Sequence, residues 1–156
     1  MNGQNIPRRS SVRYLGVTVD DKFSWKEQRA AVRRKCFSGL SQLCKLRDVL
    51  PVSTKVKLYN ALVLPHTDYC SVVWHECGVV QQRQVERIQN YGMRLILGKP
   101  PRTPSNELRT HLRWMTLSRR RQMLRLNMIY RCLHNQAPGY LQNHFITSQM
   151  STYHKG

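Results

Sequence analysis

The chain has 156 residues, 40% of them apolar, which is enough for one domain with a hydrophobic core. Its 26 Lys and Arg stand against 8 Asp and Glu, a formal net charge of +18. Such an excess repels itself in a compact state and indicates an anionic partner, with nucleic acid ahead of a membrane surface. The sequence predicts no membrane span and no signal peptide, so we expect an intracellular protein, cytoplasmic or nuclear, that is not secreted.

Motifs for metal or cofactor chemistry are missing from the sequence. Five cysteines occur without a C-x-x-C pair and are interpreted as reduced thiols, so neither a zinc site nor a cofactor is expected. The hydrolase patterns G-x-S-x-G and H-E-x-x-H are absent, as are glycine-rich phosphate loops. Composition and motifs together favour binding over catalysis.

The first predicted element is a strand. Residues 1–11 are polar and expected to be flexible, and residues 12–19 alternate with Leu15, Val17 and Val19 on the better apolar face. Two aspartates, 20 and 21, follow the strand. Ser24 and Glu27 then have the spacing of a capping box, which predicts a helix from about Trp25 to Val49.

Helices account for the rest of the predicted fold. Ser53 is expected to cap a second helix that is interrupted at Pro65, and residues 67–75 fit a short helix or a strand equally well. The next helix, from about Val80 to Leu97, carries an apolar stripe of Val85, Ile88, Gly92, Leu95 and Ile96, with Gly98 as its C′ residue. Thr103 is expected to cap a short helix ending at Leu112, and Ser118 to begin the last long one.

The predicted fold class is therefore mainly α. We expect a small helical bundle preceded by one short β-strand or hairpin, forming one domain over residues 12–146, with a flexible tail over 147–156. Trp25, Trp74 and Trp114 lie beside apolar neighbours, which favours core packing over stacking on bases.

Basic residues are grouped on three predicted helices. Arg83, Arg87, Asn90 and Arg94 are spaced i, i+4, i+7 and i+11 opposite the apolar stripe, and Arg121 and Arg125 lie one turn apart on the last helix. The first helix has a basic cluster of Lys26, Arg29, Arg33, Arg34 and Lys35. Guanidinium groups suit phosphate oxygens. For any one arginine a solvated position is the simpler interpretation; for the set we predict backbone contacts to a nucleic-acid duplex.

Five segments in order resemble the C-terminal region of LINE-type (non-LTR) retrotransposon reverse transcriptases. They are YLGV with the downstream FSWK, KLYNALVLPHTDYCSVVW, VERIQNYGMRLILG, LRTHLRWMTLSRRR and YRCLHNQAPGYLQNHF, together covering roughly residues 12–146. In that family the region comprises the primer-grip strand and the helical thumb. The resemblance implies that Tyr14, Leu15 and Gly16 steady a primer end, and that the partners are an RNA–DNA or DNA duplex and the palm domain of a parent polymerase.

The aspartate pair does not match the catalytic motif of that family. There the pair follows an aromatic residue two positions earlier, whereas Thr18 precedes Asp20 here. We therefore interpret Asp20 and Asp21 as strand-end and turn residues and expect no catalytic residues.

Two functions are predicted from these observations. The first is a non-catalytic fragment of a reverse transcriptase, from a degraded or domesticated element, that binds the primer–template backbone. The alternative is a structural remnant that self-associates through an exposed apolar face of Leu15, Val17 and Val19.

Overall fold

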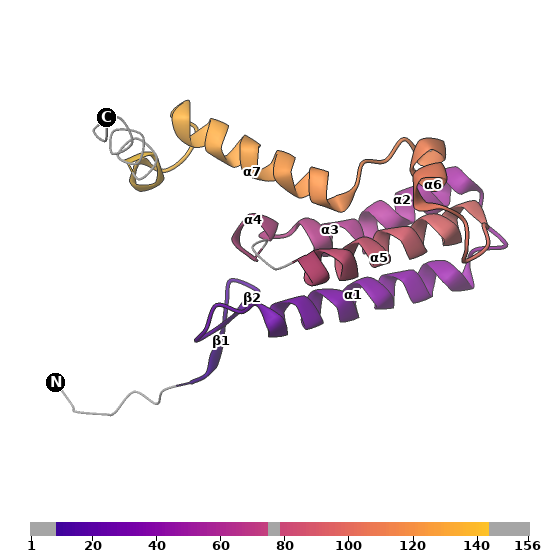
Figure 1. The fold of residues 1–156 in the computed structure, drawn as a ribbon, viewed down its shortest axis with the longest axis horizontal. Coiled ribbons are helices and arrows are strands. Elements are labelled where there is room, and N and C mark those ends of the chain that lie inside the picture. Colours follow the sequence, from indigo (N-terminus) through magenta and orange to yellow (C-terminus); the bar gives the residue numbers. More distant parts are fainter. Residues whose placement is uncertain (1–8, 75–78, 144–156) are drawn as a thin grey trace. The chain divides into compact units, whose positions relative to one another are not determined.

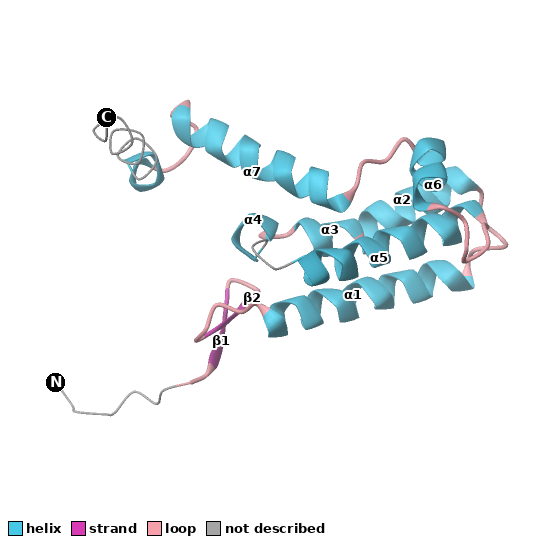
Figure 2. Cartoon of the chain, in the orientation of Figure 1, coloured by secondary structure: helices cyan, strands magenta, loops and turns pink. Residues whose placement is uncertain are grey.

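The computed structural model describes residues 9–74 and 79–143, in two compact units, Met1–Leu117 and Ser118–Gly156. Figures 1 and 2 show a hairpin followed by helices. The elements are β1 (Ser11–Tyr14), β2 (Val17–Asp20), α1 (Lys26–Lys45), α2 (Val52–Leu62), α3 (Leu64–Asp68), α4 (Ser71–Trp74), α5 (Val79–Leu97), α6 (Ser105–Leu112) and α7 (Leu117–Leu133). The mainly α fold class is confirmed. The predicted flexible ends lie outside the described residues, except for residues 9–11.

The strand pattern of residues 12–19 forms a tight hairpin, the second of the two alternatives predicted for this region. β1 and β2 pair antiparallel with Tyr14 opposite Val17, so Leu15 and Gly16 form a two-residue turn. Both turn residues have positive φ, 45° and 81°, and turns of this kind match the twist of paired strands. The alternation of apolar and polar residues over 12–19 does not reveal the turn, because the pattern runs unbroken through Leu15 and Gly16. Leu15 is consequently 74% exposed, whereas Val17 is buried.

Asp20 organises the connection from β2 to α1. Its carboxylate accepts hydrogen bonds from the backbone N–H groups of Lys22 (3.2 Å), Ser24 (2.9 Å) and Trp25 (2.8 Å). These donors, that of Ser24 first, lower the pKa of Asp20. The interpretation of Asp20 as a strand-end and turn residue is confirmed.

The predicted capping box at Ser24 is wrong. Trp25 is the N-cap residue of α1, has φ 57°, and makes no capping hydrogen bond through its side chain. It is buried instead, and the chain turns sharply enough to bring it into the core. α1 also ends at Lys45, earlier than the predicted Val49.

The core of the first unit is formed largely by α1, α2 and α5. Two glycines permit close packing there: a Cβ on Gly39 would lie 2.6 Å from the carbonyl oxygen of Leu62, and one on Gly92 would overlap the ring of Tyr59. The predicted apolar residues of α5 are buried. The main buried side chains are Val32, Cys36, Leu40, Leu43, Tyr59, Val63, Trp74, Val85, Ile88, Leu95 and Ile96.

Three further local predictions are settled by the structure. Residues 71–74 are helical, and the indole of Trp74 donates a 2.9 Å hydrogen bond to the carbonyl of Tyr69. Ser53 lies inside α2, whose N-cap is Pro51, and Pro104 rather than Thr103 precedes α6. The helix ends were misplaced because proline supplies the extended conformation that a polar cap was expected to provide.

The tryptophans and cysteines agree with the predictions where the structure describes them. Trp25 and Trp74 are buried, and Trp114 packs on Tyr59 with ring centroids 4.8 Å apart. Among the described residues Cys36, Cys44, Cys70 and Cys132 form no disulfide; Cys77 lies outside the described residues.

Candidate nucleic-acid interface

The hairpin tip presents Tyr14, Leu15 and Gly16, the residues expected to resemble a primer grip. Tyr14 is 69% exposed, and Gly16 is exposed beside it. The hydroxyl of Tyr69, just after α3, donates a 2.7 Å hydrogen bond to the carbonyl of Leu15. The Tyr69 ring would be 3.5 Å from a Cβ on Gly16, so it packs against the turn. The tip is thus exposed and anchored.

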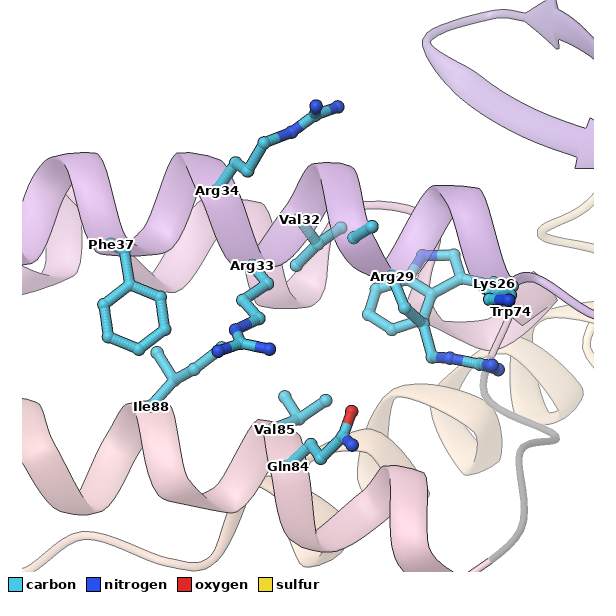
Figure 3. A pocket seen from close by; sticks show the side chains of 11 residues that line it. Lys26, Arg29, Val32, Arg33, Arg34, Phe37, Trp74, Gln84, Val85 and Ile88 are labelled. Carbon is cyan, nitrogen blue, oxygen red and sulfur yellow. The ribbon is translucent and has the colours of Figure 1, made fainter.

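The basic cluster of α1 is divided between two sides of the helix. On one side, facing α5, lies a cavity of about 600 Å³ that we call the α1–α5 groove (Figure 3). Lys26, Arg29 and Arg33 extend into it from α1. Its other lining side chains include Phe37, Gln84 and the apolar Val32, Trp74, Val85 and Ile88.

The second hollow lies between the hairpin, α1 and α3. This hairpin pocket, of about 460 Å³, is lined by cations from different elements, Arg13 from β1 and Arg34 and Lys35 from α1, together with His66 and Tyr69. Burial lowers the pKa of His66, and the charge of Lys35 lowers it further. Arg34 borders both hollows, and its guanidinium extends away from α5 (Figure 3).

The two halves of the polar stripe predicted on α5 have different surroundings. Arg83 and Arg87 are exposed, with no acidic group within ion-pair distance in the described part of the chain. Arg94 instead donates a 3.0 Å hydrogen bond to the carbonyl of Thr103, and Asn90 accepts one of 3.3 Å from Arg109 on α6. Packing of α6 against α5 therefore uses the second half of the stripe for structure.

The arginines of α7 belong to the second unit. Arg121 is 2% exposed, so it does not offer the open guanidinium that a phosphate contact requires. Arg125 is partly exposed.

An aromatic pair at the edge of the α1–α5 groove was missed by sequence reasoning: Phe37 lines the groove, and Tyr91 lies beside Phe37. The rings of Phe37 and Tyr91 have centroids 6.4 Å apart and planes inclined by 43°. The guanidinium carbon of Arg33 lies 5.6 Å from the centroid of the Phe37 ring, a cation–π contact. Phe37 is 42% exposed and Tyr91 is 43% exposed. No sequence signal pairs them, because they meet only when α1 and α5 pack.

Two ion pairs in the described part of the chain involve acidic side chains. Arg47 pairs with Asp48 at 3.1 Å and Lys99 with Glu107 at 3.9 Å, both at exposed sites where such pairs contribute little stability. Across residues 9–74 and 79–143, no group of three His, Cys, Asp or Glu side chains is arranged to hold a metal ion. None of the helices described is both long and apolar enough to cross a bilayer.

Comparison with known proteins yields a match to a polymerase. No family model matches the chain, and no solved structure matches it. Over 103 residues the chain is 24% identical to a protein of Drosophila melanogaster described as a probable RNA-directed DNA polymerase from transposon BS. The match covers 64% of this chain but 11% of the Drosophila protein. The chain is thus similar to a short stretch of a transposon reverse transcriptase.

Proposed function

We propose that the chain is a thumb-like module, related to LINE-type reverse transcriptases, that holds a primer–template duplex by its phosphates and performs no catalysis itself. The observation that carries this proposal is the pair of neighbouring helices α1 and α5 with exposed or partly exposed arginines. These are Arg29 and Arg33 on α1 and Arg83 and Arg87 on α5.

Guanidinium groups without acidic partners are available for phosphate oxygens. Arg29 donates a 2.9 Å hydrogen bond to the carbonyl of Ser24, which leaves its other donors for a ligand. Each phosphate that an arginine neutralises releases counterions from the nucleic acid, so binding is favourable at any sequence.

The hairpin tip completes the proposed interface. Tyr14, Leu15 and Gly16 contact the end of the primer strand, and the hydrogen bond from Tyr69 to Leu15 holds the turn in place for that contact. Asp20 does not contribute metal chemistry, because its carboxylate faces three backbone donors.

The self-association alternative depended on an exposed apolar face. In the structure Val17 is 6% exposed and Val19 is partly buried, while α1 packs against β2. Only Leu15 of the three is exposed, and it is part of the turn. No observation in the described residues favours this second function.

Salt dependence of binding tests the proposal. Fluorescence anisotropy with a labelled blunt RNA–DNA duplex should give a log–log slope of about −0.9 per phosphate contact, so about −3 to −4 for the four arginines. The double variant Arg83→Ala/Arg87→Ala should reduce the slope by about 2 without altering sequence preference.

The matched control removes the same charge elsewhere in the first unit. Lys57 on α2 and Arg102 before α6 are exposed, so Lys57→Ala/Arg102→Ala should leave the slope close to that of the original chain. A flat slope, or equal losses in the two double variants, would contradict the proposal.

A further inference from the structure

The α1–α5 groove has features that phosphate contacts to a duplex do not use. The groove is a cavity of about 600 Å³, lined by cations from α1 and by apolar side chains from both α1 and α5. The rigid backbone of a duplex needs only charges at the surface, whereas a cavity with apolar and aromatic walls fits a flat, partly apolar group.

The aromatic pair lies where two hollows meet. Phe37 lines the α1–α5 groove, and Tyr91 lines a neighbouring cavity of about 480 Å³ that also includes Arg94 and Lys99. Because the centroids of the two rings are 6.4 Å apart, within the range of aromatic pairs, the cations of both cavities flank one aromatic surface.

Phe37 and Tyr91 are exposed aromatic side chains with cations on both sides, Arg33 over Phe37 and Arg94 and Lys99 beside Tyr91. Exposing about 40% of Phe37 and of Tyr91 to water is unfavourable in free energy, and Arg33 covers only part of Phe37. Stacking platforms bordered by cations are the arrangement by which proteins bind single-stranded nucleic acid.

We propose that the α1–α5 groove binds a single nucleic-acid strand, with one unpaired base against the Phe37–Tyr91 pair and the adjoining phosphates at Lys26, Arg29 and Arg33. Along α1 the rise per residue places Lys26 about 16 Å from Phe37, which accommodates a short run of nucleotides. The inference deepens the proposed function, on which it rests, by naming an unpaired strand adjoining the duplex as part of the substrate. In that substrate Arg29 and Arg33 contact phosphates of the unpaired strand, whereas with a blunt duplex they contact the duplex itself.

Nucleic acid is favoured over an acidic peptide by the aromatic pair. Both polyanions satisfy the cations, but a carboxylate side chain has no π face to stack on Phe37 or Tyr91. The groove is therefore expected to distinguish a base from a charge.

The test removes aromatic surface and keeps the charge. Binding of the full chain is measured by anisotropy with three labelled probes: oligothymidylate, an oligomer of equal length with abasic sites, and the blunt RNA–DNA duplex. In Phe37→Leu/Tyr91→Leu, the dissociation constant for oligothymidylate should rise about 5- to 150-fold, the equivalent of losing one stacked base. The abasic oligomer and blunt duplex should bind the variant and the original chain equally.

A control variant and a direct readout support the interpretation. Phe23→Leu removes an aromatic ring that is 66% exposed outside the groove and should leave oligothymidylate binding unchanged. Photocrosslinking of an oligomer with 5-iodouracil should label the peptide containing Phe37 or that containing Tyr91. Circular dichroism should show that the double variant remains helical. If the double variant is unfolded, the position of the crosslink in the unsubstituted chain tests the proposal instead.

The outcomes separate this inference from the proposed function. Aromatic-dependent binding of oligothymidylate without duplex binding would support the groove and contradict the duplex function. Salt-dependent duplex binding with no effect of Phe37→Leu/Tyr91→Leu, or crosslinks elsewhere, would overturn the groove proposal and leave the duplex function intact. Competition by polyglutamate equal to that by oligothymidylate would also overturn it, in favour of an acidic protein partner.

Discussion

The α1–α5 groove and the hairpin pocket share the helix α1 but differ in the chemistry they offer. Arg33 extends into the groove, while the guanidinium of Arg34 points away from α5 (Figure 3). Successive residues on a helix are separated by about 100°, so one run of basic residues supplies cations to two surfaces. The groove adds apolar side chains and Phe37, beside which Tyr91 packs; the hairpin pocket adds His66 and the anchored hairpin. A cluster of charge in sequence therefore does not define one binding site.

The largest effect is expected from disturbing the contact between α2 and α5, which holds one wall of the groove. Gly92→Ala would place a Cβ against the ring of Tyr59, and we expect the free energy of unfolding to fall by about 1–3 kcal/mol. Single-strand binding should weaken with it, while the hairpin pocket, which α5 does not line, should keep its geometry. Urea denaturation and anisotropy measure the two effects.

Gly98→Ala is the matched control. Nothing lies within 4 Å of a Cβ at Gly98, but its φ is 63°, so only the backbone cost of about 1 kcal/mol is expected. If Gly98→Ala impaired single-strand binding as much as Gly92→Ala, the effect would reflect global stability and not the wall of the groove.

The next prediction compares the two sides of α1 with two variants that change the net charge by the same amount. Arg33→Glu should weaken oligothymidylate binding about tenfold, the value of one hydrogen bond to a charged group, since it removes the cation beside Phe37. Arg34→Glu changes the net charge equally but should act less on this ligand, because its guanidinium extends away from α5. Equal losses in the two variants, measured by anisotropy, would show that net charge alone governs binding.

The smallest effect concerns the titration of His66. Its folded-state pKa is lowered below 6.5, so the unfolded chain binds the proton more readily. The stability from neutral His66 is therefore present above pH 6.5 and is lost as pH falls through the folded-state pKa. Arg13, Arg34 and Lys35 line the same pocket. In NMR titrations, Lys35→Met should raise the pKa of His66 only part of the way, because burial is the first cause; an unchanged pKa would contradict the assigned contribution of Lys35.

Periodicity in the sequence was sufficient to predict the long helices and the buried face of α5, but not whether residues 67–75 are helical. Val85, Ile88, Gly92 and Ile96 recur at helical spacing because one side of α5 must leave water, and all four are buried. Gly98 after the helix and the turn role of Asp20 were likewise readable, since only certain residue types suit those backbone conformations.

Relations between elements were decided by the tertiary structure alone. Asp20 binds the backbone at the start of α1 because Trp25 turns into the core, and this arrangement displaced the predicted cap at Ser24. Phe37 and Tyr91 form one aromatic surface only because α1 lies beside α5, and Arg94 is withdrawn from the basic stripe by its hydrogen bond to the carbonyl of Thr103, in the segment before α6. Local spacing specifies which side of a helix is apolar or charged. What each side meets depends on the packing of distant segments.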